Sequence, residues 1–300
     1  MITIRGLTKK FDGRPALNGM DLTVADGSIY GLVGTNGAGK TTVIKHMAGV
    51  LKPDAGEILF DDQPVWENPA VKERIGLVPD ELYFPNRYSL ADMKKIYRDT
   101  YPLWNETRFD DMTGIFKLEQ KRPIRTFSKG MTKQAAFSLV LSTMPDYLLL
   151  DEPIDGLDPI VRKIVWRYIV NDVAERGTSV LVSSHNLKEM EDICDSVGII
   201  SAGRTILERD LDSIKDSICK VQLAFPRGEA READTTGLDV IHKERHGTVE
   251  LLIIKNDFET AEKVLLPQEP VLFDILPLSL EEIFIYELGG EDNEIRKLIF

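Results

Sequence analysis

The sequence is poor in cysteine, in long apolar runs and in positive charge. Only Cys194 and Cys219 occur among its 300 residues, which excludes a disulfide framework and a thiolate metal site. No stretch approaches the roughly 18 consecutive apolar residues that a membrane-spanning helix needs. The N-terminal residues lack the apolar block of a secretory signal. We therefore expect a cytoplasmic protein.

The charge balance of the chain is acidic. Lys and Arg number 37 against 49 Asp and Glu, which gives a formal net charge of −12. Because non-specific nucleic-acid binding depends on neutralising phosphates, this balance predicts no nucleic-acid partner. With 43% hydrophobic and 29% charged residues, the composition is that of a folded protein with a sizeable core.

Segments of different character follow one another along the chain. Short strands open it, helical stretches rich in aromatic residues follow over about 86–144, and apolar strands alternate with helices over 147–200. The last pattern is typical of a parallel sheet. Further on, alternating strands and a helix at Glu259–Leu266 predict a small α+β unit. We therefore predict one domain over 1–210 and an accessory α+β domain over 211–300.

A glycine-rich loop follows the apolar strand Ile29–Val33. It fits the pattern G-x-x-x-x-G-K-[ST] at every fixed position, and Thr42 continues into a predicted helix. In such a loop, backbone N–H groups converge on phosphate oxygens, and the helix N-terminus adds partial positive charge. Lys40 would reach the β- and γ-phosphates, and the Thr41 hydroxyl would bind Mg²⁺. The motif in its strand–helix context predicts nucleotide binding rather than a chance glycine loop. The candidate nucleotide-binding residues here are Gly34, Thr35, Asn36, Gly37, Ala38, Gly39, Lys40, Thr41 and Thr42.

Three polar residues follow predicted buried strands. Asp151 and Glu152 come after Tyr147–Leu150, and His185 closes Ser179–Ser184. Parallel strands bring their carboxyl ends, and with them the glycine loop, to one edge of the sheet. There Asp151 would hold Mg²⁺ and Glu152 would orient the attacking water. Without the phosphate loop, the acids would be interpreted as solvated and the histidine as a bystander. With it, His185 is a candidate contact of the γ-phosphate.

A second candidate anion site begins at Ser128. This residue is a good helix N-cap, and Ala135 and Leu139 continue along one helical face. A helix N-terminus at this point would bind an anion separately from the glycine loop.

In this order, the motifs resemble those of the ATP-binding cassette (ABC) ATPases, specifically the nucleotide-binding subunit of a bacterial exporter-type ABC transporter. The resemblance covers about residues 1–210. Gly34–Thr41 matches the Walker A loop and Leu148–Glu152 matches Walker B, with Glu152 as its catalytic glutamate. Ser128–Gln134 stands where the family signature lies. Three single residues are also similar to family positions: the D-loop acid Asp158, the switch histidine His185 and the adenine-stacking aromatic Phe11.

The resemblance implies both a fold and a function. The fold is α/β: a P-loop ABC-type ATPase core with a mixed sheet, an antiparallel β subdomain and a helical subdomain, followed by the small C-terminal α+β domain. The function is ATP hydrolysis with Mg²⁺, which energises transport through separate integral-membrane permease subunits. Two subunits, in a homodimer or a heterodimer, would enclose ATP between them on the inner face of the cell membrane. Ser128, Lys129 and Gly130 would complete the partner's pocket.

The sequence departs from the family pattern at two places. In the signature, Phe127, Lys129 and Met131 replace the usual Leu, Gly and Gln, while Ser128 and Gly130 keep the hydroxyl and the close backbone approach. After an earlier strand, Asp80 stands in place of the usual glutamine. Its carboxylate would still serve the Mg²⁺ ion.

Other functions fit these motifs less well than that of a transporter subunit. A soluble ABC ATPase that acts on DNA or ribosomes would carry coiled-coil insertions or two cassettes, and a P-loop kinase or GTPase would need other motifs. A regulatory cassette that binds ATP without driving transport stays open because of Asp80 and the altered signature. Most aromatics of the helical region are expected in its core, whereas Tyr83, Phe84 and Tyr88 are candidate partner contacts.

Overall fold

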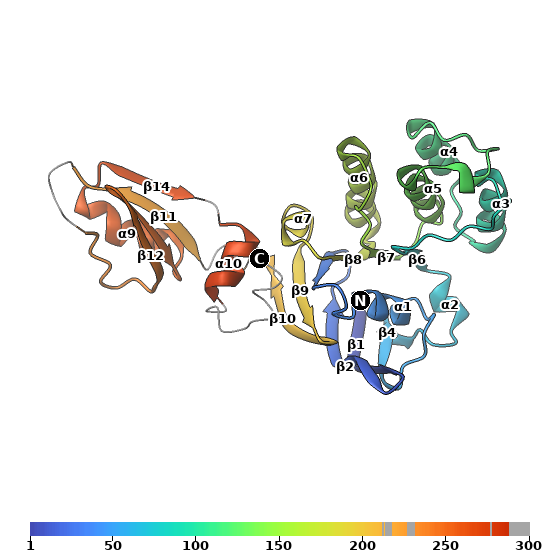
Figure 1. Ribbon diagram of the computed structural model, residues 1–300, viewed down its shortest axis with the longest axis horizontal. Helices are drawn as coiled ribbons and strands as arrows, with labels where there is room; N and C mark the ends of the chain where they lie inside the picture. The colour runs from blue at the N-terminus through green and yellow to red at the C-terminus, as the bar shows by residue number, and fades with distance from the viewer. Residues whose placement is uncertain (212, 214–217, 227–231, 277, 288–300) are drawn as a thin grey trace. The chain divides into compact units, whose positions relative to one another are not determined.

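The structure is a computed structural model, and it describes residues 1–211, 213, 218–226, 232–276 and 278–287. These residues fall into two units (Figure 1). The first comprises Met1–His185 and Ser196–Glu208, and the second comprises Asn186–Asp195 and the described residues from Arg209 onward. The second unit thus takes in Asn186–Asp195, which the predicted boundary after residue 210 assigns to the first domain. No helix among the described residues is long and apolar enough to cross a membrane.

The first unit begins with an antiparallel sheet. Apolar residues alternate along its first strand, so Ile2 and Ile4 join Leu22 and Phe60 in the core. The pairing of Ile2 with Val24 and of Ile4 with Leu22 keeps these side chains on one face. The strand order is β2 (Arg14–Val24), β1 (Ile2–Phe11), β4 (Ala55–Phe60) and β5 (Gln63–Pro64).

A second sheet of six strands carries the glycine loop. The strands β9, β3, β8, β7 and β6 pair in parallel, and β3, β7 and β8 are buried along their whole length. Val33 pairs with Ser184, and Asp151 pairs with Ser183, so three strands end at the same edge. The strand order is β10 (Arg204–Asp210), β9 (Ser196–Ser201), β3 (Ile29–Val33), β8 (Ser179–Ser184), β7 (Tyr147–Asp151) and β6 (Ile75–Val78).

Helices of the first unit lie around this sheet and in a separate group (Figure 1). The group α3, α4 and α5 has its own core, in which Leu90 and Phe109 contact the buried face of α5. Tyr97 stacks on Tyr101 at 5.5 Å between ring centroids, so these aromatics pack as expected. The helices are α1 (Lys40–Met47), α2 (Pro69–Lys72), α3 (Leu90–Thr100), α4 (Glu106–Ile115), η1 (Ile124–Thr126), α5 (Lys129–Ser142) and α6 (Pro159–Arg176).

The second unit contains a four-stranded antiparallel sheet and short helices. Ala261 and Leu265 on α9 pack against Val221 and Leu252 of the sheet. A capping box is present at Ser279, since its N–H donates to Glu282 at 3.0 Å and the N–H of Glu282 donates to the Ser279 hydroxyl at 3.3 Å. The sheet order is β12 (Val240–His246), β13 (Val249–Ile254), β11 (Cys219–Ala224) and β14 (Leu272–Leu276). The helices are α7 (Leu187–Glu191), α9 (Phe258–Leu265), η2 (Leu266–Gln268) and α10 (Leu280–Glu287). Part of the predicted 211–300 domain lies outside the described residues.

Candidate functional site

The glycine loop Gly34–Thr41 connects β3 to α1. Its turn into the helix depends on Gly39, whose φ of 115° is one that residues with a side chain rarely adopt. A Cβ at this position would also lie 3.0 Å from the carbonyl oxygen of Ala16. The loop therefore enters α1 with backbone N–H groups at the helix N-terminus, where a phosphate can be bound.

Lys40 connects this loop to the acidic strand end. Its Nζ donates to the carbonyl oxygen of Gly34 at 2.7 Å and lies 3.1 Å from Oε1 of Glu152. The lysine side chain is buried, and Glu152 is mostly covered. A buried ammonium group is stable only when oxygen atoms surround it, and the loop carbonyl and the carboxylate supply them.

One serine hydroxyl orients both acids after β7. The hydroxyl of Ser183 donates to Oδ1 of Asp151 at 2.7 Å and accepts from the backbone N–H of Glu152 at 3.0 Å. Asp151 is buried, whereas the chain turns at Glu152 with a φ of 44°, in the left-handed region. This turn separates the directions of the two carboxylates, as their different predicted roles require.

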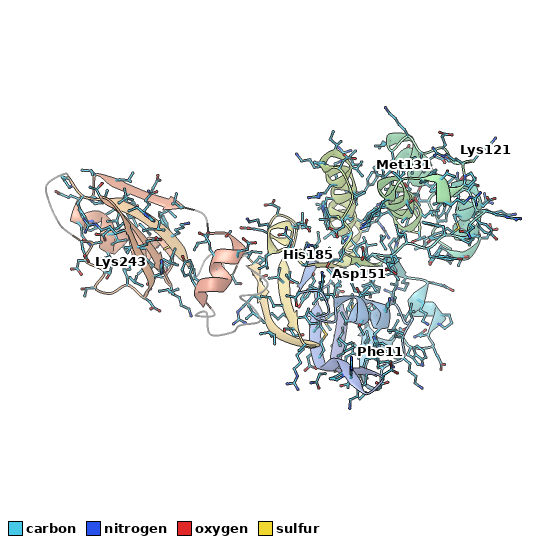
Figure 2. All side chains as sticks on the ribbon, viewed as in Figure 1. Phe11, Lys121, Met131, Asp151, His185 and Lys243 are labelled. Atoms are coloured by element: carbon cyan, nitrogen blue, oxygen red, sulfur yellow. The ribbon has the colours of Figure 1, made fainter. Side chains whose placement is uncertain are left out.

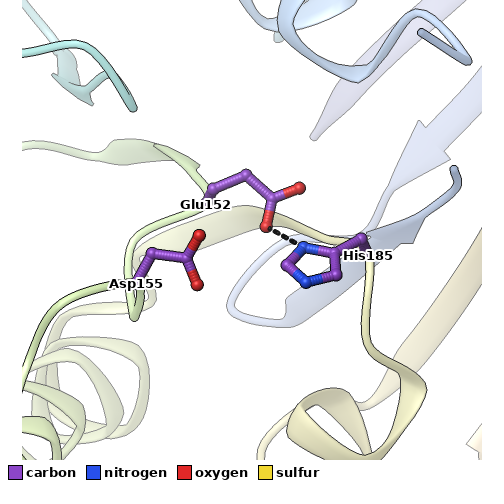
Figure 3. Close-up of side chains that lie close together, drawn as sticks. All are labelled: Glu152, Asp155 and His185. Carbon is purple, nitrogen blue, oxygen red and sulfur yellow. Dashed lines mark hydrogen bonds and ion pairs between the residues drawn. The ribbon is translucent and has the colours of Figure 1, made fainter. Parts of the chain in front are cut away.

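His185 lies against the carboxylate of Glu152 (Figure 3). Its Nδ1 is 3.0 Å from Oε2 of Glu152, and its side chain is half exposed. Asp155 adds a third group, because ligand atoms of Glu152, Asp155 and His185 all lie within 4.8 Å of one another. Lys40 and His185 thus both contact the carboxylate of Glu152.

A buried lysine that was not predicted from the sequence completes this cluster. Lys133 on α5 is 1% exposed, and its Nζ donates to the backbone carbonyl of Glu152 at 2.7 Å. The same Nζ lies 3.9 Å from Oδ1 of Asp80, whose side chain is 45% exposed. Burial lowers the pKa of Lys133, while the carboxylate of Asp80 acts in the opposite direction. The available signals were the charge among apolar helix residues and the unusual carboxylate at position 80.

The signature residues lie elsewhere in the unit. The hydroxyl of Ser128 caps α5 by accepting from the N–H of Met131 at 3.2 Å, and Lys129 is exposed. A Cβ at Gly130 would lie 3.1 Å from the carbonyl oxygen of Gly156, so this segment runs close to the D-loop. In Figure 2, Met131 is well separated from Asp151. Met131 and Asp151 therefore lie apart within one chain.

Two other predicted site residues, Phe11 and Asp158, contact residues that are close to them in the sequence. Phe11 ends β1 with 45% of its surface exposed, and Nζ of Lys9 lies 5.7 Å from its ring centroid. Figure 2 places it apart from His185. Asp158 accepts from the N–H groups of Ile160 and Val161, at 3.0 and 3.1 Å, and so caps α6.

The predicted partner contacts differ in exposure. Tyr83 is 84% exposed and Tyr88 is 40% exposed, whereas Phe84 packs against the core of the helical group. Their role as partner contacts stays a prediction.

The chain is similar to known proteins over almost its whole length. Residues 17–155 match the family described as ABC transporter. Over 294 residues the chain is 33% identical to the ABC transporter ATP-binding protein YtrB of Bacillus subtilis (strain 168), covering 97% of this chain and 99% of that protein. It is 29% identical to the Nod factor export ATP-binding protein I of Burkholderia lata, covering 97% of each chain. A solved "Structure of ATP binding subunit of ABC transporter" has a TM-score of 0.66 and 25% identity, and the match covers 72% of this chain and 92% of that one.

The fold defines an α/β ATP-binding cassette, which confirms the predicted fold class. The chain belongs to the family of ABC transporter ATP-binding proteins. It is therefore the ATP-binding and ATP-hydrolysing subunit of an ABC transporter.

Proposed function

We propose that Glu152 is the general base of ATP hydrolysis and that Lys40 and His185 bind the terminal phosphate. The observation that carries this proposal is the contact of both side chains with the Glu152 carboxylate, at 3.1 Å and 3.0 Å. A carboxylate at this place accepts a proton from the attacking water, and the two neighbouring nitrogen groups are donors for phosphate oxygens. The loop from Gly34 to Thr42 would bind the rest of the triphosphate.

The metal ion in this proposal is Mg²⁺, held by Thr41 and Asp151. The contact between Lys40 and Glu152 brings their chain neighbours Thr41 and Asp151 to the same edge of the sheet. Hydroxyl and carboxylate oxygens are the ligands that Mg²⁺ prefers, so the donor set fits this ion. When bound, Mg²⁺ neutralises charge on the phosphates. Asp80 also offers a carboxylate oxygen to Mg²⁺, but this carboxylate already lies beside the ammonium group of Lys133.

The remaining predicted residues act across a pair of cassettes. The separation of Met131 from Asp151 within one chain supports a role for Ser128, Lys129 and Gly130 on ATP held by the partner cassette. Asp158 would meet the partner at the same interface, and exposed Phe11 would stack on adenine.

We infer that the protein works at the inner face of the cell membrane, attached through its permease. The direction of transport is proposed to be export, because the relative from Burkholderia lata, which matches over the full length, is named an export protein. The alternative function is a cassette that binds ATP without hydrolysing it or driving transport.

A single substitution distinguishes these functions. Glu152→Gln keeps the shape of the side chain but removes the base, so hydrolysis should fall by about 100-fold or more while ATP binding persists. The measurement is single-turnover ATP hydrolysis by the purified chain, together with size-exclusion chromatography for a dimer trapped by ATP. Glu175→Gln, an exposed substitution on α6, is the control. Equal hydrolysis by both variants would contradict the assignment of the base.

A further inference from the structure

Lys133 lies where three segments of the first unit meet. It belongs to α5, the helix that begins with the signature residues. Its Nζ donates at 2.7 Å to the backbone carbonyl of Glu152, the first residue after β7. The same Nζ lies 3.9 Å from Oδ1 of Asp80, the second residue after β6. These segments carry the signature, the proposed base and the residue that replaces the usual glutamine.

The chemistry of this position is unusual for a helix core. The neighbouring residues Ala135, Ala136 and Phe137 are buried and apolar, and a methionine would fill the same space without a charge. An ammonium group at 1% exposure persists because oxygen atoms face it. One of these is the carbonyl of a residue held in the left-handed region, at a φ of 44°. The hydrogen bond thus acts on the backbone conformation that aims the Glu152 carboxylate toward His185.

The second contact explains how the chain tolerates Asp80. A glutamine is neutral, whereas Asp80 adds a negative charge to those of Glu152 and Asp155, which also act on Lys133. The Nζ of Lys133 supplies one compensating positive charge, and the same atom donates the hydrogen bond to the backbone carbonyl of Glu152.

We propose that Lys133 is a positioning residue for hydrolysis, which holds the main chain of Glu152 and pairs with Asp80, so that the segment after β6 is connected to the base through one cation. This inference rests on the proposed role of Glu152. Lys133 touches no reacting atom, and its effect passes through the orientation of the base.

Two substitutions separate the hydrogen bond from the charge. Lys133→Met removes both, and kcat for ATP should fall about tenfold or more, with KM changed less than about twofold. Lys133→Gln keeps an N–H donor for the Glu152 carbonyl, so it should lose only about threefold in kcat. Asp80→Asn should cost about threefold in the unaltered protein and nothing more in the Lys133→Gln background, because the pair is then already broken.

The measurements are kcat and KM of the purified full chain, with nucleotide affinity and the thermal midpoint of each variant. Lys163→Met, an exposed lysine substitution on α6, is the control. Loss of kcat at unchanged nucleotide affinity and thermal midpoint supports positioning. If Lys133→Met does not fold, the cycle of Lys133→Gln and Asp80→Asn decides alone.

The outcomes that overturn the inference are distinct from those that overturn the proposed function. Wild-type turnover in Lys133→Met, equal losses in the Met and Gln variants, or fully additive losses in the double variant would overturn the role of Lys133. If Glu152→Gln hydrolyses ATP normally, the proposed base is wrong, and this inference fails with it.

Discussion

The Nδ1 atom of His185 lies 3.0 Å from Oε2 of Glu152, which joins the ends of the neighbouring strands β8 and β7 across the sheet edge. The contact needs the left-handed turn at Glu152, because an extended residue would continue the line of β7. Two residues separated by 33 positions in sequence therefore form one functional unit.

Replacing His185 should affect hydrolysis more than binding. We expect His185→Gln to lower kcat by about 100-fold, because the side chain beside the base and the terminal phosphate is lost, while the loop from Gly34 to Thr41 still holds the nucleotide. Steady-state hydrolysis and nucleotide affinity are the measurements. His246→Gln, at an exposed histidine of the second unit, is the control. A rise in KM alone would show that His185 only contributes to binding.

A buried ion pair should stabilise the contact of α4 with α6. Both guanidinium nitrogens Nη1 and Nη2 of Arg108 donate to Asp172 at 2.7 Å, and the carboxylate is buried. Removing one partner leaves a buried charge, so Arg108→Ala should lower the free energy of unfolding by about 3 kcal/mol.

Urea unfolding followed by circular dichroism measures this change. The matched control is Arg98→Ala, since Arg98 and Asp99 form an exposed pair at 3.5 Å and should contribute less than about 1 kcal/mol. Equal losses of unfolding free energy in both variants would mean that the buried Arg108–Asp172 pair stabilises the protein no more than an exposed pair does.

His46 should make stability fall in mild acid. Its ring is buried on α1, and Nδ1–H donates to the carbonyl oxygen of Thr42 at 2.7 Å. Burial lowers the pKa of His46 below its ordinary value of 6.5. The unfolded chain therefore takes up a proton first as the pH falls, and the stability present above pH 6.5 is lost below it.

Thermal midpoints between about pH 7.5 and 5.5 test this dependence. In His46→Gln the midpoint should fall less over this range than in the unaltered protein. Parallel slopes for the two proteins would contradict the prediction.

Local patterns predict most of the fold around the site. The strand expected at Ile29–Val33 is present with those bounds, and the helix expected at Glu259–Leu266 is observed at Phe258–Leu265. Both depend on alternation or on caps within a few residues, which the sequence displays directly. The N-cap of α6 at Asp158, followed by Pro159, is also a local signal, separate from the D-loop role that the family resemblance implies for Asp158.

Features that depend on distant contacts escaped prediction. Lys133 is paired with a carbonyl 19 positions along the chain, and nothing in its own helix indicates that partner. The grouping of Asn186–Asp195 with the second unit depends on the contact of α7 with α10. Propensity and periodicity describe single segments, so neither contact follows from them.

Met131 and Asp151 lie apart within one cassette, and this separation bears on how ATP turnover depends on protein concentration. If the signature acts on ATP held by a partner cassette, as we propose, each molecule contributes to two catalytic centres, and neither centre is complete without a second cassette. Turnover per molecule of the purified chain should therefore drop on dilution, and a permease that holds two cassettes together would remove this concentration dependence.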